Sequence, residues 1–319
     1  MKELLTNIKA LQEETLNNLR SSKANNTIRA YRSDFKDFGV FCVKNGFKSL
    51  PTDPKIVSLY MTYLSAKDAK ISTLRRRLVS IGVVHKLKGH YLDTKHPMII
   101  ENLMGIKRKK GSYQKGKKPI LINELKLIIN VIDEIKIKAK TGLVEWKVKP
   151  SDVKRDKALI LLGFAGGFRR SELVNIEHED IEFVQEGVKI VIKRSKTDQS
   201  GEGTIKAIPY FDNEKYCPVK ALKNYMTYGF AISKKGKIFN ISDKSVALII
   251  KKYAEKAGLD SSKYAGHSLR SGFATSAAES GAEERNIMAM TGHKTTQMVR
   301  RYIKEANLFK NNALNKLKI

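Results

Sequence analysis

Apolar residues in the first third of the chain recur every three to four positions, the spacing of one face of an α-helix. The first such run lies between residues 27 and 46, and Gly46 is expected to end it as a helix-terminating glycine. Its apolar positions are Ile28, Tyr31, Phe35, Phe38 and Cys42.

Three more helices are predicted before residue 107. Asp53 as N-cap and Pro54 in the first turn mark the start of the second. The third begins at Ser72, and its inward positions are Leu74, Leu78, Ile81 and His85. The fourth covers residues 96–106, with Ile99, Ile100, Leu103 and Ile106 on its apolar face. We therefore expect residues 1–106 to form a compact bundle of four or five helices.

The segment KRKKGSYQKGKKP, residues 107–119, is basic, is interrupted by glycine and nearly lacks apolar residues. This composition predicts a linker between two domains. Such a linker can be a solvated loop or a strap that lies along phosphate groups, and the sequence leaves both open.

Beyond the linker, helical spacing continues and is then interrupted by strands. The period falls to two in GVKIVIKR, where Val188, Ile190 and Ile192 alternate, and GTIKAIPY predicts a partner strand. The turn-rich stretch SKTDQSGEG is expected to join them as a hairpin loop. Helical segments precede the hairpin and follow it, the first of them after it opening at Pro218. Residues 120–319 are therefore predicted as a mainly α domain with a small antiparallel β-sheet, an α+β architecture.

Charge gives the first indication of a partner. The chain of 319 residues has 61 Lys and Arg against 32 Asp and Glu, a net charge of +29, which attracts polyanions. Nucleic acid is the leading candidate and an anionic membrane the second. The longest apolar run, ALILLGFAGGF, is much shorter than the roughly 20 residues that span a bilayer, and the N-terminus does not resemble a signal peptide.

Neither cysteine nor histidine spacing predicts a metal site or a disulfide. Cys42 and Cys217 are far apart in sequence, and the six histidines form no HxxxH or Cys/His cluster. We expect two free thiols in a reducing, cytoplasmic setting, and no metal or other cofactor.

Basic residues on the polar faces of the first domain and in the linker are candidates for phosphate contact. Runs of this kind are often only a solvated helix face, and the sequence leaves this alternative open. The candidates are Arg29, Arg32, Arg75, Arg76, Lys107, Arg108, Lys109 and Lys110.

Six residues of the second half share one type of chemistry. They are Arg169 in GFRRSEL, Lys196 in RSKTD, His267 and Arg270 in GHSLR, His293 in TGHK and Tyr302 in RRYIK. Two arginines suit the non-bridging oxygens of a phosphodiester, on which negative charge develops during attack. A histidine can take the proton of a tyrosine nucleophile, and a hairpin lysine can protonate the leaving 5′ oxygen. The resulting phosphotyrosine bond conserves the energy of the broken ester, so no ATP is needed for rejoining.

Each of these residues also has a structural interpretation. Arg169 can cap a helix C-terminus, Lys196 can be a surface lysine, and Tyr302 can pack in the core. His267 can be a satisfied buried imidazole, and His293 can belong to the start of the next helix. Only the order and spacing of the whole set favour catalysis.

The motifs resemble those of the tyrosine recombinases, the family of phage integrases, Xer-type resolvases and Cre-like enzymes. GFRRSELVNIEHEDI resembles the first arginine box, which selects Arg169 over Arg170 and gives Glu172 a supporting role. HSLRSGFATSAAESGA resembles the HxxR box, and TGHKTTQMVRRYIK resembles the last box, in which the nucleophile is Tyr302. Lys196 falls where the family has its β-hairpin lysine.

The resemblance implies a helical, SAM-like core-binding domain over residues 1–106, a linker over 107–119 and a catalytic domain over 120–319. It implies a clamp around double-stranded DNA at an inverted-repeat site, a 3′-phosphotyrosyl intermediate and a homotetramer on two sites. It also implies a bacterial or phage-encoded protein that acts in the cytoplasm at the nucleoid, with a possible directionality factor. Residues 305–319 are expected to pack on a neighbouring subunit; the alternative is that they fold back on their own domain.

Two other functions remain open at this stage. A type IB topoisomerase would use the same chemistry to nick and relax DNA, and a non-catalytic DNA-binding protein would not need Tyr302. The biological task, whether integration, excision, resolution or inversion, leaves no trace in the sequence.

Overall fold

The computed structural model describes residues 7–21, 23–111, 116–140, 149–193, 202–229, 235–306 and 313–317. The chain divides into two compact units, Met1–Lys115 and Gly116–Ile319. Each has its own hydrophobic core. None of the helices in the described ranges is long and apolar enough to cross a membrane.

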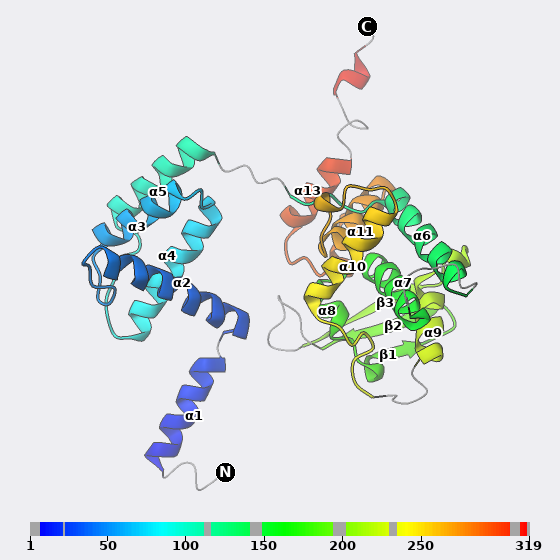
Figure 1. Ribbon diagram of the computed structural model, residues 1–319, viewed down its shortest axis with the longest axis horizontal. Helices are drawn as coiled ribbons and strands as arrows, with labels where there is room; N and C mark the ends of the chain where they lie inside the picture. The colour runs from blue at the N-terminus through cyan, green and yellow to red at the C-terminus, as the bar shows by residue number, and fades with distance from the viewer. Residues whose placement is uncertain are drawn as a thin grey trace. The chain divides into compact units, whose positions relative to one another are not determined.

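The described part of the first unit is helical (Figure 1). Its helices are α1 (Ile8–Ser21), α2 (Asn25–Lys44), α3 (Pro54–Ala66), α4 (Ile71–Leu87) and α5 (Pro97–Lys110). The core lies between α2, α3, α4 and α5, and its fully buried side chains include Phe38, Tyr60, Leu74, Ile81 and Ile99.

Local signals in the sequence placed the start of α3 and the end of α2. The Asp53 side chain accepts a hydrogen bond of 2.6 Å from the backbone N–H of Lys55, as expected of an N-cap. Gly46 has a φ of +70° and follows Asn45, the C-cap of α2, so the prediction of a terminating glycine is confirmed. His85 is buried: its Nε2 accepts from the N–H of Thr52 at 3.1 Å, and its Nδ1 lies 2.8 Å from the Ile81 carbonyl oxygen.

Several boundaries differ from the sequence prediction. Helix α4 begins at Ile71 instead of Ser72, and Ile100 on α5 is exposed instead of buried. Helix α5 continues to Lys110, so the basic run that was assigned to the linker forms its last turn. Lysine and arginine are good helix formers and are favoured at a helix C-terminus, where the macrodipole is negative. Helix α1 was not anticipated, because its sequence is mostly polar.

The second unit combines helices with a small sheet (Figure 1). Its helices are α6 (Ile122–Lys140), α7 (Pro150–Ala165), α8 (Arg170–Val174), α9 (Pro218–Gly229), α10 (Asp243–Lys256), α11 (Ser268–Glu279), α12 (Glu284–Thr291) and α13 (Thr296–Ala306). The strands β1 (Ile181–Phe183), β2 (Gly187–Ile192) and β3 (Thr204–Pro209) form an antiparallel sheet in the order β1-β2-β3. The predicted hairpin and its alternation are confirmed, whereas β1, only three residues long, was missed.

Helix α7 is central to the second core. Every residue from Ala158 to Ala165 is buried, because α7 packs against α6, α9 and α11. This burial explains the apolar run in the sequence without a membrane. Gly166 and Gly167 then end the helix, and the chain turns towards α8.

Residues that follow the linker pack directly on α11. The N–H of Ile120 donates to the Ser268 carbonyl oxygen at 2.9 Å. A Cβ atom at Gly272 would lie 1.8 Å from the carbonyl oxygen of Ile120, so this helix position accepts only glycine without a shift of the backbone. The contact fixes the helix that carries Arg270.

Candidate active site

Arg169 lies at the N-cap of α8, and two groups hold its guanidinium. Nη1 donates to Glu172 Oε1 at 2.6 Å, and Nη2 donates to the carbonyl oxygen of Gly292 at 3.2 Å. The backbone N–H of Arg169 donates to the other oxygen of Glu172 at 2.9 Å. Glu172 is therefore a buried carboxylate that fixes both the backbone and the side chain of this arginine.

Arg270 approaches the same turn from the first turn of α11. It is only 1 % exposed, and its Nη1 donates to the Gly167 carbonyl oxygen at 2.9 Å. Burial and the neighbouring Arg169 lower the pKa of Arg270 to about 10, so it is still a cation at neutral pH. Two guanidinium groups are thus held around one short turn between α7 and α8.

His267 is the N-cap of α11, and its Nε2 lies 3.4 Å from the hydroxyl oxygen of Tyr302. The residue as a whole is exposed, yet desolvation of its ring lowers the imidazole pKa below its usual value. Nearby arginines lower it further, above all Arg270 and Arg169. His267 is therefore neutral at pH 7 and can accept a proton from the phenol.

Thr291 sets the protonation of His293. The Thr291 hydroxyl is fully buried and donates its one proton to the Ile287 carbonyl oxygen at 2.6 Å, so it accepts from His293 Nδ1 at 2.7 Å. Burial and nearby cations lower the pKa of His293 to about 4. The ring is therefore neutral, with its proton on Nδ1 and a lone pair on Nε2. Gly292, at a φ of +62°, makes the tight turn that places this histidine after α12.

Tyr302 belongs to α13, and its ring is partly buried. It packs against a small cluster formed by α11, α12 and α13, and its ring centroid lies 6.0 Å from that of His293. The packing and catalytic interpretations of Tyr302 are compatible, because the ring rests on the cluster while the hydroxyl faces His267.

Lys206 also belongs to this site, although sequence reasoning did not select it. It lies on β3, is 4 % exposed, and its Nζ donates to the carbonyl oxygens of Gly166, at 2.6 Å, and Met290. Burial lowers the pKa of Lys206 to about 8. Glu172 opposes this shift, and Arg270 and Arg169 add to it. The available signal was a lysine at an inward position of a strand with period two.

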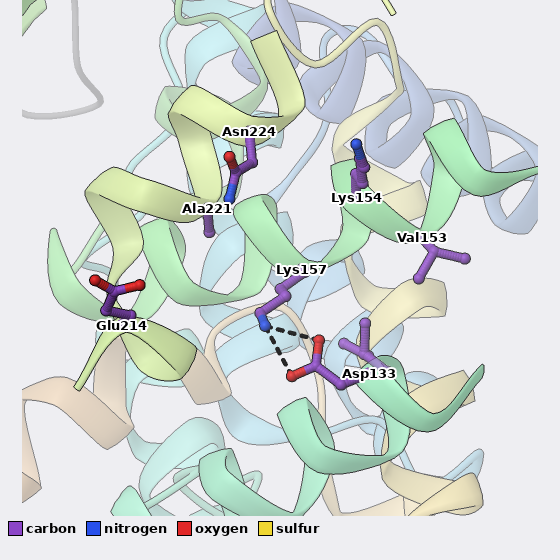
Figure 2. A pocket seen from close by; sticks show the side chains of 8 residues that line it. Asp133, Val153, Lys154, Lys157, Glu214, Ala221 and Asn224 are labelled. Carbon is purple, nitrogen blue, oxygen red and sulfur yellow. Dashed lines mark hydrogen bonds and ion pairs between the residues drawn. The ribbon is translucent and has the colours of Figure 1, made fainter. Parts of the chain in front are cut away.

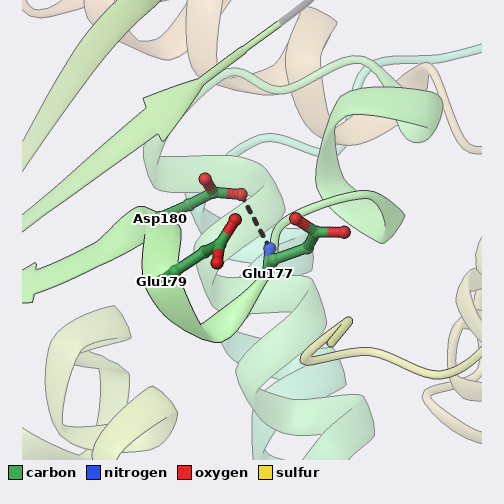
Figure 3. A group of neighbouring side chains, drawn as sticks. All are labelled: Glu177, Glu179 and Asp180. Atoms are coloured by element: carbon green, nitrogen blue, oxygen red, sulfur yellow. Dashed lines mark hydrogen bonds between the residues drawn. The ribbon is translucent and has the colours of Figure 1, made fainter. Parts of the chain in front are cut away.

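Lys196, the predicted proton donor, lies outside the described residues, within 194–201. The base of its hairpin is described. Lys193 contacts the carboxylates of Glu177 (2.9 Å), Glu179 and Asp180 (3.0 Å). One oxygen of each of these three acids lies within 4.8 Å of the other two. Figure 3 shows the three side chains side by side, an arrangement that sequence spacing did not reveal. The Lys193 ammonium already supplies a positive charge to this group.

The predicted DNA-contact residues all lie in the first unit, on α2, α4 and α5, and all are exposed. Arg76 is paired with the buried Asp34, and Lys110 donates to the Ser65 carbonyl oxygen and to Asp68 at 3.0 Å. Arg29, Arg32, Arg75, Lys107, Arg108 and Lys109 are the remaining candidates.

A pocket of about 200 Å³ lies in the second unit, among residues of α6, α7 and α9. Lys157 donates to both oxygens of Asp133 there, at 2.7 and 2.8 Å (Figure 2). None of the residues that line it belongs to the Arg169, Arg270 and Tyr302 cluster. The candidate chemistry is therefore separate from this cavity.

Comparison with known proteins identifies relatives, one of which matches nearly the whole chain. The sequence profile of the phage integrase family matches residues 130–308. An integrase/recombinase XerD homologue of Selenomonas ruminantium is 43% identical over 314 residues, which cover 94% of this chain and 87% of that protein. Tyrosine recombinase XerA of Pyrococcus horikoshii is 30% identical over 172 residues, covering 54% of this chain and 58% of that protein.

Two solved structures share the fold. One is the XerH site-specific recombinase bound to palindromic difH substrate, with a TM-score of 0.59, 16% identity and coverage of 82% of this chain and 73% of that one. The other is a lambda integrase dimer bound to a COC′ core site, with a TM-score of 0.57, 14% identity and coverage of 98% and 80%.

Proposed function

We propose how this protein acts from one premise: the chain belongs to the phage integrase family and is a site-specific tyrosine recombinase, which cuts and rejoins DNA. The sequence resemblance to this family is thereby confirmed. Membership favours strand exchange over both alternatives, a relaxing topoisomerase and a non-catalytic DNA-binding protein. The residue roles that follow are our proposal.

Arg169 and Arg270 bind the two non-bridging oxygens of the scissile phosphate. Both side chains are already held by carbonyl oxygens or by Glu172, so little reorganisation is needed when charge develops on the phosphate. Planar guanidinium groups present paired N–H donors that match phosphate oxygens.

Tyr302 is the nucleophile. Its oxygen forms a bond to phosphorus while the bond from phosphorus to the 5′ oxygen breaks, and His267 takes the phenolic proton. Lys196 donates a proton to the departing 5′ oxygen. The product is a 3′-phosphotyrosyl ester and a free 5′ hydroxyl. Attack by a 5′ hydroxyl reverses the steps, and because one ester replaces another, no ATP is required.

His293 contacts the same phosphate through Nε2. The Thr291 hydroxyl keeps the ring proton on Nδ1, so Nε2 becomes a donor only after it takes up a proton. The negative charge of the bound phosphate favours that uptake, because an adjacent anion raises the pKa of an imidazole.

The proposal rests mainly on one observation: the Tyr302 hydroxyl lies 3.4 Å from His267 Nε2. Arg169 and Arg270 are close enough to His267 to lower its pKa. The test is a nicked DNA substrate whose short cleaved strand diffuses away and so traps the covalent complex. Tyr302→Phe should give no covalent band on a denaturing gel while DNA affinity is retained. Tyr91→Phe, at a tyrosine that is 86% exposed in the first unit, is the matched control and should cleave normally. A covalent band in Tyr302→Phe would contradict the assignment.

Arg270→Ala should slow cleavage about 100- to 1000-fold, since it removes one donor to the developing charge. Arg285→Ala, at an exposed arginine paired with Glu283, should not. Equal rates for the two variants would remove Arg270 from the mechanism.

DNA is the partner of this enzyme, and we propose that the site is an inverted repeat occupied by a homotetramer that spans two duplexes. The XerH structure carries a palindromic substrate, which supports such a site. We place the enzyme at the nucleoid of a bacterial cell or on phage DNA, with a directionality factor where one product is favoured.

The tail over residues 305–319, most of which lies outside the described residues, would join subunits. Its deletion should leave cleavage of single sites intact and abolish the pairing of two sites.

A further inference from the structure

Lys206 has an ionisable side chain at a core position of the sheet. On β3 it points to the same side as Ile208, it pairs in register with the buried Ile190, and it is 4 % exposed. An apolar residue at this position would pack without any cost of desolvation, whereas a buried ammonium must be hydrogen-bonded to be tolerated. Packing alone therefore does not explain a lysine here.

The contacts of the Lys206 ammonium join two segments that are distant in sequence. Nζ donates to the carbonyl oxygen of Gly166, three residues before Arg169, and to that of Met290, three residues before His293. It also lies 4.6 Å from the centroid of the Phe168 ring. One side chain thus connects the turn after α7 to the C-terminal end of α12.

The same two segments also bind the catalytic arginines. Arg270 donates to the Gly167 carbonyl oxygen at 2.9 Å, and Arg169 donates to that of Gly292 at 3.2 Å. Lys206 is thus a third cation on this pair of turns, and its ammonium is bound to their carbonyl oxygens. Its protons are directed at carbonyl oxygens, so its geometry is that of a support and not of a proton donor.

We propose that Lys206 is a positioning residue of the recombination reaction, whose buried ammonium holds residues 166–169 and 290–293 at the separation at which Arg169, Arg270 and His293 meet one phosphate. The inference rests on the proposed roles of those three residues. A neutral side chain of similar length cannot donate to both carbonyls, so the turns lose their common attachment. A displacement of about 1 Å among catalytic groups is enough to slow a reaction about 100-fold.

The test is Lys206→Met, which keeps the length and removes the charge, with Lys189→Met on the outward face of β2 as the matched control. Cleavage is measured in a single turnover on two substrates, a normal phosphodiester and one with sulfur in place of the 5′ bridging oxygen. Sulfur leaves without a proton, because a thiol has a pKa of about 8.5. Lys206→Met should be about 100-fold slower on both substrates, with unchanged DNA affinity.

Lys196→Ala provides the contrast, because loss of a proton donor is rescued by the sulfur substrate. Rescue of Lys206→Met by sulfur would make Lys206 a proton donor, and a normal rate would make it a structural residue only; either result overturns the proposal. If Lys206→Met does not fold, Lys206→Arg decides the question. The bulkier guanidinium keeps the charge but cannot reproduce both contacts with the carbonyl oxygens of Gly166 and Met290. Lys206→Arg should therefore cleave both substrates slowly, and a normal rate would refute the proposal.

The two proposals fail separately. A covalent band in Tyr302→Phe would overturn the proposed function whatever Lys206 does. Loss of the band in Tyr302→Phe together with a normal rate in Lys206→Met would overturn only the role of Lys206.

Discussion

At the residue scale, buried polar groups hold the residues to which we assign catalytic roles. Thr291 is the clearest of these, because its buried hydroxyl decides which nitrogen of His293 holds the proton. Glu172 acts in the same way on Arg169. A sequence motif indicates which side chains are candidates for catalysis. The contacts of Thr291 and Glu172 fix the orientation and the protonation of these side chains.

Thr291→Val keeps the shape of the side chain and removes the acceptor for His293 Nδ1. We expect cleavage about tenfold slower, the effect of one hydrogen bond, and ¹⁵N chemical shifts of His293 that show a mixture of tautomers. Thr291→Ser retains the hydroxyl and should restore both the rate and the single tautomer. A Thr291→Val enzyme with a normal rate and unchanged shifts would show that the hydroxyl has no such role.

The lowered pKa of His267 predicts a specific pH profile. A lowered pKa keeps the imidazole neutral as pH falls, so the second-order rate of covalent complex formation should stay level from pH 8 to about 6.5. It should then decrease at more acidic pH, where the base becomes protonated. His267→Gln should form the covalent complex slowly, and its rate should not decrease further at acidic pH. A decline that already begins near pH 7.5, or a decrease at acidic pH that persists in His267→Gln, would contradict His267 as the proton acceptor.

At the scale of elements, helix α11 carries His267 and Arg270 and is held by an unusually close approach of the backbone. Gly272→Ala should lower the free energy of unfolding of the second unit by about 1–3 kcal/mol, because the new methyl group would overlap the Ile120 carbonyl oxygen. Gly105→Ala in α5 meets no atom within 4 Å and should raise the stability of the first unit by about 0.5–1 kcal/mol through helix propensity. Urea unfolding followed by circular dichroism measures both, and a neutral Gly272→Ala would disprove the steric argument.

The elements also show where sequence patterns lose information. The alternation of β2 could be detected in the sequence because Val188, Ile190 and Ile192 are all apolar and all face the core. On β3 the inward face contains Lys206 beside Ile208. A charged residue interrupts the apolar alternation in the sequence, although both side chains are buried. Helix α1 was missed because most of its residues are polar and its few apolar positions did not stand out. The last turn of α5 was assigned to the linker because its four residues are all basic.

At the scale of the whole molecule, the net charge of +29 is the dominant feature. DNA affinity should therefore fall linearly with salt on logarithmic axes, by about 10³- to 10⁵-fold between 50 and 200 mM if six to ten phosphates are contacted. Arg75→Ala should reduce this slope by about 1, as the loss of one phosphate contact does. Arg285→Ala, at an exposed arginine outside the predicted contacts, should leave it unchanged. An unaltered slope in Arg75→Ala would place Arg75 off the DNA.

The sequence by itself determined the mainly helical class, the hairpin and the basic character, and it indicated the six residues to which we assign catalytic roles. These features depend on periodicity, on charge and on motifs whose order is preserved along the chain, all of which are local or additive properties. The tertiary structure alone decided which nitrogen of His293 carries the proton, which carbonyl oxygens hold the two arginines, and that the Lys206 ammonium is bound to the same two turns. Gly166 and Met290 are more than a hundred residues apart in the chain, and only folding brings their carbonyl oxygens to one ammonium. Desolvation and hydrogen bonding depend on such neighbours in space, and no spacing along the sequence encodes them.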